Sequence, residues 1–349
     1  MSTPRASKLD MSRAKPAAFL TTKQEYATVT EAAGLVNRSS VGLLKIMGTD
    51  TLDLLDRLST NKLVDLQAGQ GKYSVLTSNK GRVIDLLFVA IREDHLLVLT
   101  GPDTQSRVAE WIDFYTFAED VTITDLSNAM SMLAVVGPAA SRVLDETSGE
   151  PLSSLGPHES AQAEFGGLDV IVIRTDFARI PSYDLVVAAS DEKLLWEKLV
   201  RSGEPIGLKP VGSQALEVVR IEQGVPVQGK ELNEDANPLE AGLFDHVSFN
   251  KGCYIGQEVV ARLDTYDKVQ RKLVGVSWHE NAAPVEHAPL RAADTTVGQV
   301  TSYAHSFRLG KALALAYVRN AHAKPGLALS MDSTDGPIGV RVEDLPLTL

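Results

Sequence analysis

Residues 220–275 run RIEQGVPVQGKELNEDANPLEAGLFDHVSFNKGCYIGQEVVARLDTYDKVQRKLVG and contain the local motif KGCYIGQE at 251–258. Cys253 in this motif is the only cysteine among 349 residues. Lys251 stands two positions before it, and a helix that begins at 256–258 would bring unpaired N–H groups close to the sulfur. Both features favour a thiolate. We therefore expect an exposed, functional thiol that iodoacetamide labels in the native protein, with a small buried hydrophobe as the alternative.

The neighbours of the cysteine also suit a binding site. Gly252 and Gly256 would let a ligand approach the backbone closely. Gln257 has an amide that donates and accepts hydrogen bonds. Glu258 is either a catalytic acid or a first-turn residue favoured by the helix dipole.

Composition excludes several classes of protein. Hydrophobic residues make up 44% of the chain and charged residues 23%, as in folded soluble proteins. The net charge of −11 argues against tight direct binding of nucleic acid, and no apolar run is long enough to span a membrane. One cysteine cannot form an internal disulfide, and the seven histidines show no metal-ligand spacing, so we expect no permanently bound metal.

The first residues, 1–18, lack the apolar core of a secretion signal and predict a flexible tail. We expect a cytoplasmic protein. Arg5, Lys8, Arg13 and Lys15 against the single acid Asp10 leave the mitochondrial matrix as an alternative.

The hydrophobic pattern predicts an α+β fold. Residues 48–63 and 103–117 have the spacing of amphipathic helices, with Asp103 as the expected cap of the second. Between them, residues 73–100 contain three short strands that we expect to form an antiparallel meander. A second series of strands and helices follows, so we expect two α+β subdomains within 19–268. Residues 269–349 contain short strands between loops and predict a small β-barrel.

Three ordered blocks carry a family resemblance: RIEQG at 220–224, NPLEAGL at 237–243 and KGCYIG at 251–256. They resemble the superfamily of the glycine cleavage T-protein and the YgfZ-type folate-binding proteins. The stretch GKYSVLTSNKGRVIDLLFV at 71–89 is similar to the strand-turn-strand of that superfamily. The resemblance covers most of 34–349 and implies a three-lobed ring around a folate-sized opening.

Two features distinguish this chain from the usual T-protein pattern. KGCYIGQE matches the motif associated with the YgfZ-type branch. In addition, Ile180 occupies the place that the resemblance assigns to a pterin-holding glutamate, and a sec-butyl group accepts no hydrogen bond. Of two adjacent aspartates usual in T-proteins, only Asp85 is present here, after Ile84. Asp85 is either a retained catalytic carboxylate or a solvated strand-edge acid.

The resemblance also implies candidate folate contacts. Arg220 is a possible pocket-lining residue or the partner of a neighbouring glutamate. The basic residues near the motif are a solvated face or a site for the glutamate tail of folate or an acidic partner. The full set of candidates comprises Cys253 and Asp85 for catalysis, and Lys251, Gly252, Tyr254, Gly256, Gln257, Glu258, Arg262 and Arg220 for folate binding or the motif, with Lys268, Arg271 and Lys272 completing the basic group.

The resemblance to the YgfZ-type branch implies a tetrahydrofolate-binding accessory protein for the assembly or repair of iron-sulphur enzymes, which would be its clients. The alternative is a folate-dependent aminomethyl- or methyltransferase in which Asp85 is the polar catalytic group. A third interpretation is a tRNA-binding adaptor for iron-sulphur enzymes that modify tRNA, which the net charge disfavours. The sequence is compatible with both a catalytic and a non-catalytic protein.

Overall fold

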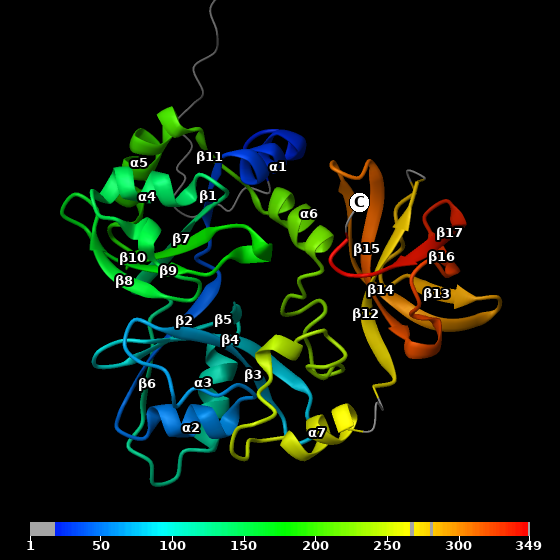
Figure 1. The fold of residues 1–349 in the computed structure, drawn as a ribbon, viewed down its shortest axis with the longest axis horizontal. Helices are drawn as coiled ribbons and strands as arrows, with labels where there is room; N and C mark the ends of the chain where they lie inside the picture. The colour runs from blue at the N-terminus through cyan, green and yellow to red at the C-terminus, as the bar shows by residue number, and fades with distance from the viewer. Residues whose placement is uncertain (1–17, 266–268, 280–281, 348–349) are drawn as a thin grey trace, which may run out of the picture.

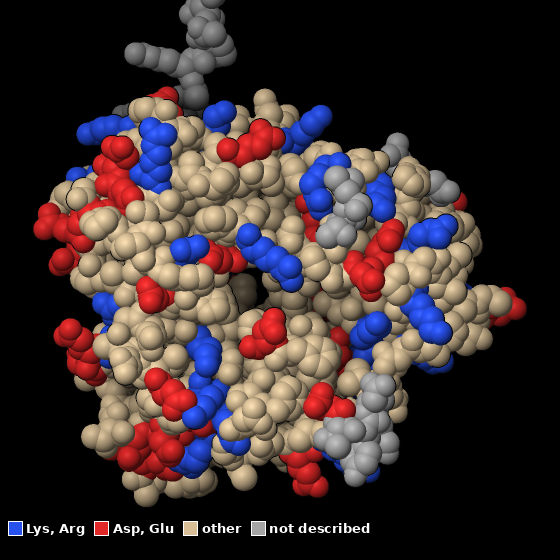
Figure 2. Space-filling view, viewed as in Figure 1, with Lys and Arg blue, Asp and Glu red and all other residues tan. Residues whose placement is uncertain are grey.

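The computed structural model describes residues 18–265, 269–279 and 282–347. They form three units around a central opening, which is visible as a hollow in the space-filling view (Figures 1 and 2). The expected α+β fold with antiparallel sheets is therefore confirmed. The expected tail, apart from residue 18, and the expected boundary at 268 lie outside the described residues. Within the described part of the chain, no helix is both long and apolar enough to cross a membrane.

The first unit contains a five-stranded sheet with helices on one face. Helices α2 (Thr51–Leu58) and α3 (Gln105–Phe114) bury Leu54, Leu55 and Ile112 against it. The strand order is β3 (Gly71–Thr77), β4 (Val83–Ile91), β5 (Leu96–Pro102), β2 (Val41–Met47) and β6 (Thr122–Asp125). Strands β3, β4 and β5 form the expected antiparallel meander.

The second unit contains a six-stranded sheet with helices on both faces. Helices α4 (Ala140–Ser148) and α5 (Glu192–Gly203) cover one face, and α1 (Thr22–Glu31) and α6 (Ser213–Gln223) pack against the other. The strand order is β11 (Leu208–Pro210), β1 (Ala33–Asn37), β7 (Met130–Val136), β10 (Ser182–Ala188), β9 (Asp169–Arg174) and β8 (Ser160–Glu164).

The two sheets also pack against each other through an apolar cluster. Phe88 and Leu99 of the first sheet belong to the same buried cluster as Met132 and Val186 of the second. This contact explains why β4 is buried along almost its whole length. A strand buried on both faces shows a nearly continuous apolar run, which is how VIDLLFVAI appears in the sequence. The single acid in that run is Asp85.

The third unit is a closed barrel, as the sequence predicts. Its strand order is β12 (Arg271–Trp278), β15 (Lys311–Arg319), β14 (Thr295–Ser306), β13 (Pro289–Ala292), β16 (Ala328–Ser333) and β17 (Gly336–Glu343). Helix α7 (Gln257–Thr265) precedes it along the chain and begins where the motif predicts. Short 3-10 turns occur at Leu152–Ser154, Phe177–Arg179, Glu204–Ile206, Phe244–His246 and Asn320–His322.

One predicted helix cap differs from the structure. Helix α3 begins after Thr104, and not after Asp103 as expected. Asp103 has a φ of 57°, in the left-handed region, and therefore belongs to the turn before the helix. The hydroxyl of Thr104 makes no capping hydrogen bond, because it is directed to Asp85.

Candidate active site

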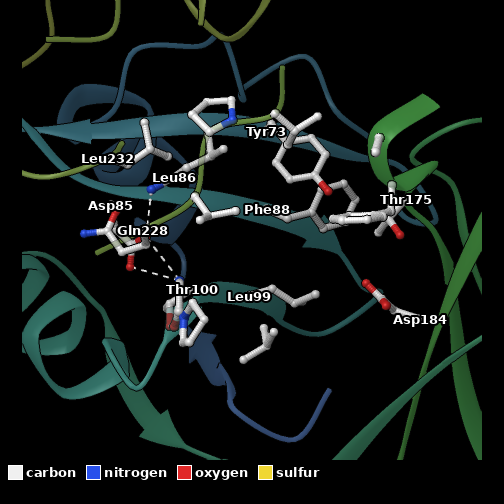
Figure 3. A pocket seen from close by; sticks show the side chains of 18 of the residues that line it. Tyr73, Asp85, Leu86, Phe88, Leu99, Thr100, Thr175, Asp184, Gln228 and Leu232 are labelled. Atoms are coloured by element: carbon white, nitrogen blue, oxygen red, sulfur yellow. Dashed lines mark hydrogen bonds between the residues drawn. The ribbon is translucent and has the colours of Figure 1, made fainter. Parts of the chain in front are cut away.

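A cavity of about 430 Å³ opens between the two sheets and the segment 225–232. Figure 3 shows Asp85 and Gln228 at one end and Asp184 with Thr175 at the other, with Phe88 and Tyr73 between them. Its volume falls in the range typical of small-molecule sites. The side chains with functional groups along its walls are Arg38, Tyr73, Asp85, Thr100, His158, Thr175, Asp176, Arg179, Asp184, Gln228 and His246.

Asp85 is completely buried and held by three donors. Its Oδ1 accepts from the backbone N–H of Leu86 at 2.8 Å, the Gly101 N–H lies 3.1 Å from both carboxylate oxygens, and the Thr104 hydroxyl lies 2.5 Å from Oδ2. Burial raises the pKa of Asp85, and these hydrogen bonds oppose the shift. A buried carboxylate with a raised pKa at the wall of a cavity is suited to proton transfer or to pairing with a cationic ligand.

Aromatic rings form the wall between the two ends of the cavity. The ring centroid of Tyr73 lies 4.9 Å from that of Phe88 and 5.3 Å from each of those of His158 and His246. Burial lowers the pKa of both imidazoles and raises that of Tyr73 to about 12. All four rings are therefore uncharged near neutral pH, and they offer flat surfaces on which a planar ligand can stack.

Asp184 and Arg38 form an ion pair at the second end. Arg38 Nη1 lies 2.6 Å from Oδ1 and 2.7 Å from Oδ2 of Asp184, which is 1% exposed. Burial raises the pKa of Asp184, and the adjacent guanidinium opposes that shift. Among the described residues, the hydrogen bonds of Arg38 side-chain atoms involve only Nη1. The Nε and Nη2 donors are thus free of partners in this part of the chain.

Ile180 does not line the cavity. Its side chain packs with Phe177 against the cluster that includes helix α6. The segment before it turns sharply, with positive φ at Asp176, Ala178 and Arg179, which determines which side chains face the cavity. Two carboxylates on either side of Ile180 in the chain, those of Asp176 and Asp184, line the cavity. The site therefore retains carboxylates although position 180 is an isoleucine.

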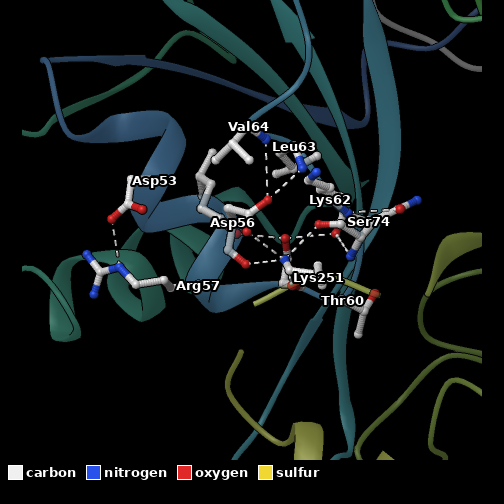
Figure 4. Close-up of polar contacts among 12 residues, drawn as sticks. Asp53, Asp56, Arg57, Thr60, Lys62, Leu63, Val64, Ser74 and Lys251 are labelled. Atoms are coloured by element: carbon white, nitrogen blue, oxygen red, sulfur yellow. Dashed lines mark hydrogen bonds and ion pairs between the residues drawn. The ribbon is translucent and has the colours of Figure 1, made fainter. Parts of the chain in front are cut away.

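Lys251 lies inside the protein, beneath helix α2 (Figure 4). Its ammonium group donates to the carbonyl oxygens of Asp56, Ser59 at 2.9 Å and Asn61 at 2.8 Å, and it lies 3.1 Å from Asp56 Oδ2. Lys251 thus caps the carboxyl end of α2, where a cation is favoured. Because its donors are committed to these oxygens, the ammonium is not free to stabilise a thiolate at Cys253.

The rest of the motif also connects parts of the fold. Tyr254 is buried, with its ring centroid 5.5 Å from Lys251 Nζ. The carbonyl of Ile255 accepts from the Thr77 hydroxyl at 2.6 Å. Gly256 has a φ of 82°, and a side-chain carbon there would lie 2.4 Å from the Ser78 carbonyl oxygen. The motif therefore joins α2 to the turn between β3 and β4.

None of the motif residues lines the cavity. Cys253 is exposed, as expected, and so is Gly252. Gln257 and Glu258 open α7, with Glu258 in its first turn, and Arg262 is in the last turn. Among the described residues, no group of three or more histidine, cysteine or acidic side chains is placed to hold a metal ion.

Arg220 is buried at the contact between α6 and the barrel. Its guanidinium donates to Glu217 at 2.5 and 2.7 Å, to Glu231 at 3.2 Å and to Ser302 at 2.6 Å. The expected glutamate pairing is therefore present, and Arg220 is not among the residues that line the cavity. In the basic group, Arg271 pairs with Glu240, and Lys268 lies outside the described residues.

Several cavity residues were not among the sequence candidates. They include Arg38, Tyr73, His158, Asp184, Gln228 and His246. Asp184 had a usable signal, because it is the only acid in the apolar strand SYDLVVA, just as Asp85 is in VIDLLFVAI. A lone charge within a buried strand requires a partner or a function. The other residues come from loops and from strands whose polar residues give no such signal.

Two domain models match the chain, one over the two α+β units and one over the barrel. The model described as "GCVT N-terminal domain" covers 7–251, and "Glycine cleavage T-protein C-terminal barrel domain" covers 271–348. The chain belongs to the glycine cleavage T-protein family.

Individual relatives agree with the domain models. An aminomethyltransferase from Shouchella clausii is 33% identical over 335 residues, which cover 95% of this chain and 90% of the relative. One from Symbiobacterium thermophilum is 32% identical, with the same coverage. The glycine cleavage aminomethyltransferase T of Bartonella henselae has the same fold, with a TM-score of 0.84, 21% identity and coverage of 94% and 89% of the two chains.

These relatives correct the functional expectation. The predicted accessory role toward iron-sulphur enzymes is wrong, because relatives that match 95% of the chain are named aminomethyltransferases. The predicted iron-sulphur clients and the predicted link to tRNA modification are wrong for the same reason. The structure gives the physical reason, since the two features that favoured that interpretation, the KGCYIGQE motif and Ile180, both lie outside the cavity.

Proposed function

We propose that the protein is a tetrahydrofolate-dependent aminomethyltransferase whose reaction takes place in the central cavity. The observation that carries this proposal is the placement of two buried carboxylates, Asp85 and Asp184, at opposite ends of one aromatic-walled cavity. Membership of the glycine cleavage T-protein family supports it. The relatives' names favour this branch over the YgfZ-type one.

The walls of the cavity fit a pterin ring. Tyr73, Phe88, His158 and His246 provide uncharged flat surfaces for stacking. At the second end, the Asp184 carboxylate can accept hydrogen bonds from the ring N–H and the exocyclic amine of a pterin. The unpartnered donors of Arg38 can meet a ring carbonyl at the same place. A pterin is flat and has donors and acceptors along one edge, so these groups complement it.

Asp85 supplies the charged group at the reacting end. Tetrahydrofolate, when bound, provides the nitrogen that receives the one-carbon unit. Asp85 holds the amine-bearing donor beside that nitrogen, and its carboxylate stabilises positive charge on the donor. As the bond from carbon to the folate nitrogen forms, the bond from carbon to the donor's carrier breaks, and the carrier leaves with the proton that the nitrogen loses. Burial raises the pKa of Asp85, and a carboxyl group with a raised pKa is better suited to take up a proton. Holding both partners in one cavity supplies the proximity that the transfer needs.

The test has a binding arm and a transfer arm. Calorimetric titration of the purified protein with tetrahydrofolate should give saturable binding to one site. With a ¹³C-labelled aminomethyl donor added, NMR should show the label on tetrahydrofolate. Binding without label transfer from any aminomethyl donor would refute the transferase assignment, and no binding would refute the folate assignment. Cys253→Ala is the matched control and should behave as the wild type.

A further inference from the structure

Thr104 occupies the cap position of helix α3, yet its side chain does not cap the helix. Its hydroxyl lies 2.5 Å from Oδ2 of Asp85 and 2.9 Å from the carbonyl oxygen of Gly101. A threonine at a cap position normally accepts a hydrogen bond from a backbone N–H of the first turn and stabilises the helix. Helix α3 gives up that stabilisation, and the contact with Asp85 takes its place.

Thr104 contacts Asp85 from outside the central cavity. The side chain of Asp85 is completely buried in the protein and lines the cavity, whereas Thr104 is not among the lining residues. A ligand in the cavity can therefore meet the carboxyl group of Asp85 without touching Thr104. Any effect of the threonine on such a ligand must act through Asp85.

Gly101 connects the two residues through its backbone. Its N–H lies 3.1 Å from both carboxylate oxygens of Asp85, and its carbonyl oxygen is the second acceptor for the Thr104 hydroxyl. A side-chain carbon at residue 101 would lie only 2.9 Å from Oδ1 of Asp85. The absence of a side chain at Gly101 thus lets the backbone, the carboxyl group and the hydroxyl form one cluster.

The two oxygens of Asp85 have partners of different kinds. Oδ1 accepts from the N–H groups of Leu86 and Gly101, and these groups can only donate. Oδ2 is bonded to the Thr104 hydroxyl, which can donate or accept. A proton on Asp85 is therefore best placed on Oδ2, where it can be donated to the threonine oxygen. The hydroxyl proton of Thr104 can then point to the Gly101 carbonyl oxygen.

We propose that Thr104 is a positioning residue for Asp85, and that its hydroxyl rotates between Oδ2 and the Gly101 carbonyl oxygen as the carboxyl group loses and gains a proton. The inference rests on the proposed transferase function and adds to it a residue outside the cavity. Thr104 keeps its own proton throughout, and the proton that Asp85 gains or loses is exchanged with the contents of the cavity. The rotation leaves Oδ2 with a partner in both states, and an unpaired buried polar group is costly.

Loss of the hydroxyl should favour the protonated form of Asp85. A hydrogen bond donated to a carboxylate is stronger than one between two neutral groups, so Thr104 stabilises the ionised form more than the protonated form. Burial raises the pKa of Asp85, and the Thr104 hydroxyl opposes that shift, as does the charge of Arg107 on α3. Arg107 pairs with Glu234 at 2.5 Å, a contact that does not involve residue 104.

The experiment compares Thr104→Val, which keeps the shape without the hydroxyl, with Thr104→Ser, which keeps the hydroxyl. NMR of ¹³C-carboxyl-labelled aspartate follows the protonation of Asp85 in the full-length protein, and Asp85→Asn assigns its signal. The midpoint of the titration should move to higher pH by about one pH unit in Thr104→Val and stay at the wild-type pH in Thr104→Ser. A midpoint that does not move in Thr104→Val, or that moves equally in both variants, would overturn the proposal.

A further variant and a second readout complete the test. If Thr104→Val does not fold, Thr104→Ala removes the hydroxyl without placing a new methyl group beside Asp85, and the same change is expected. The titration requires neither folate nor donor, so it is independent of the proposed function. The expected titration in a protein that transfers no label would support the positioning role and refute the transferase assignment. A pH–rate profile that moves in Thr104→Val while the titration does not would overturn the positioning role alone.

Discussion

Lys251 Nζ lies 3.1 Å from Asp56 Oδ2, with the lysine side chain 0% exposed and the aspartate side chain 11% exposed. The pair joins the KGCYIGQE motif to the carboxyl end of α2, 195 residues earlier in the chain. Burial lowers the pKa of Lys251, and Asp56 opposes that shift. The lysine of the motif therefore contributes to folding, and the motif's residues belong to a structural junction rather than to the cavity.

Replacement of Lys251 by methionine should destabilise the protein strongly. The change keeps most of the volume but leaves Oδ2 of Asp56 and three carbonyl oxygens without the lysine donor. Breaking a buried pair in this way costs about 3–5 kcal/mol. Denaturant unfolding followed by circular dichroism measures it. Lys62→Met is the control, because Lys62 pairs with Asp65 on the surface and should leave stability almost unchanged. Equal stability of the two variants would contradict the assignment.

Asp85→Asn should slow transfer strongly and preserve the fold. The asparagine oxygen can still accept from the Leu86 and Gly101 N–H groups. The new amide N–H can donate to the Thr104 hydroxyl oxygen. The hydroxyl proton can then point to the Gly101 carbonyl oxygen, which lies 2.9 Å from Oγ1. Loss of a group that transfers protons typically lowers the rate by about 10²–10⁴-fold. Label transfer from the aminomethyl donor measures the loss, and a variant with wild-type rates would exclude Asp85 from the chemistry.

The raised pKa of Asp85 makes stability depend on pH. The folded state binds the proton more tightly than the unfolded state, so this group's contribution to stability falls as pH rises from the unfolded to the folded pKa. Asp85→Asn removes that dependence. The unfolding free energy of the variant minus that of the wild type should therefore rise with pH between the unfolded and the folded pKa of Asp85. This pH range begins at the ordinary pKa of aspartate and extends above it. A difference that is constant with pH would show that the carboxyl is not desolvated.

Asp184→Asn should weaken tetrahydrofolate binding. The substitution removes one of the two oxygens that can accept from a pterin edge and the charge that orients Arg38. We expect about a tenfold loss of affinity, as for a hydrogen bond to a charged group. Calorimetry measures it. Asp169→Asn, an exposed position on the neighbouring strand β9, should bind like the wild type. If Asp184→Asn keeps wild-type affinity, the pterin does not bind at this end.

Cys253 should be dispensable for transfer. The thiol is exposed, and Cys253 is not among the residues that line the cavity. Iodoacetamide should therefore label the native protein stoichiometrically and leave the rate of label transfer unchanged. Mass spectrometry counts the label, and the same sample is then assayed. Inactivation that occurs in the wild type and is absent in Cys253→Ala would place the thiol in the mechanism after all.

Local patterns predicted those features that depend on near neighbours in the chain. The meander of β3, β4 and β5, the start of α7 and the C-terminal barrel follow from apolar periodicity and turn residues. The cap of α3 was misplaced by one residue, because Thr104 contributes its hydroxyl to Asp85 instead. This hydrogen bond joins Thr104 to a residue of strand β4, so no pattern in the sequence around residue 104 indicates it.

The sequence by itself determined the fold class, the barrel and the superfamily, but not the branch within it, because periodicity and ordered blocks along the chain are shared by both branches. Tertiary structure decided which polar groups serve the cavity. Arg38 and Asp184 are 146 residues apart, and Lys251 and Asp56 are almost 200 apart, yet each pair forms a buried contact. The role of a charged side chain follows from its partners and its burial, and chain folding alone brings those partners together.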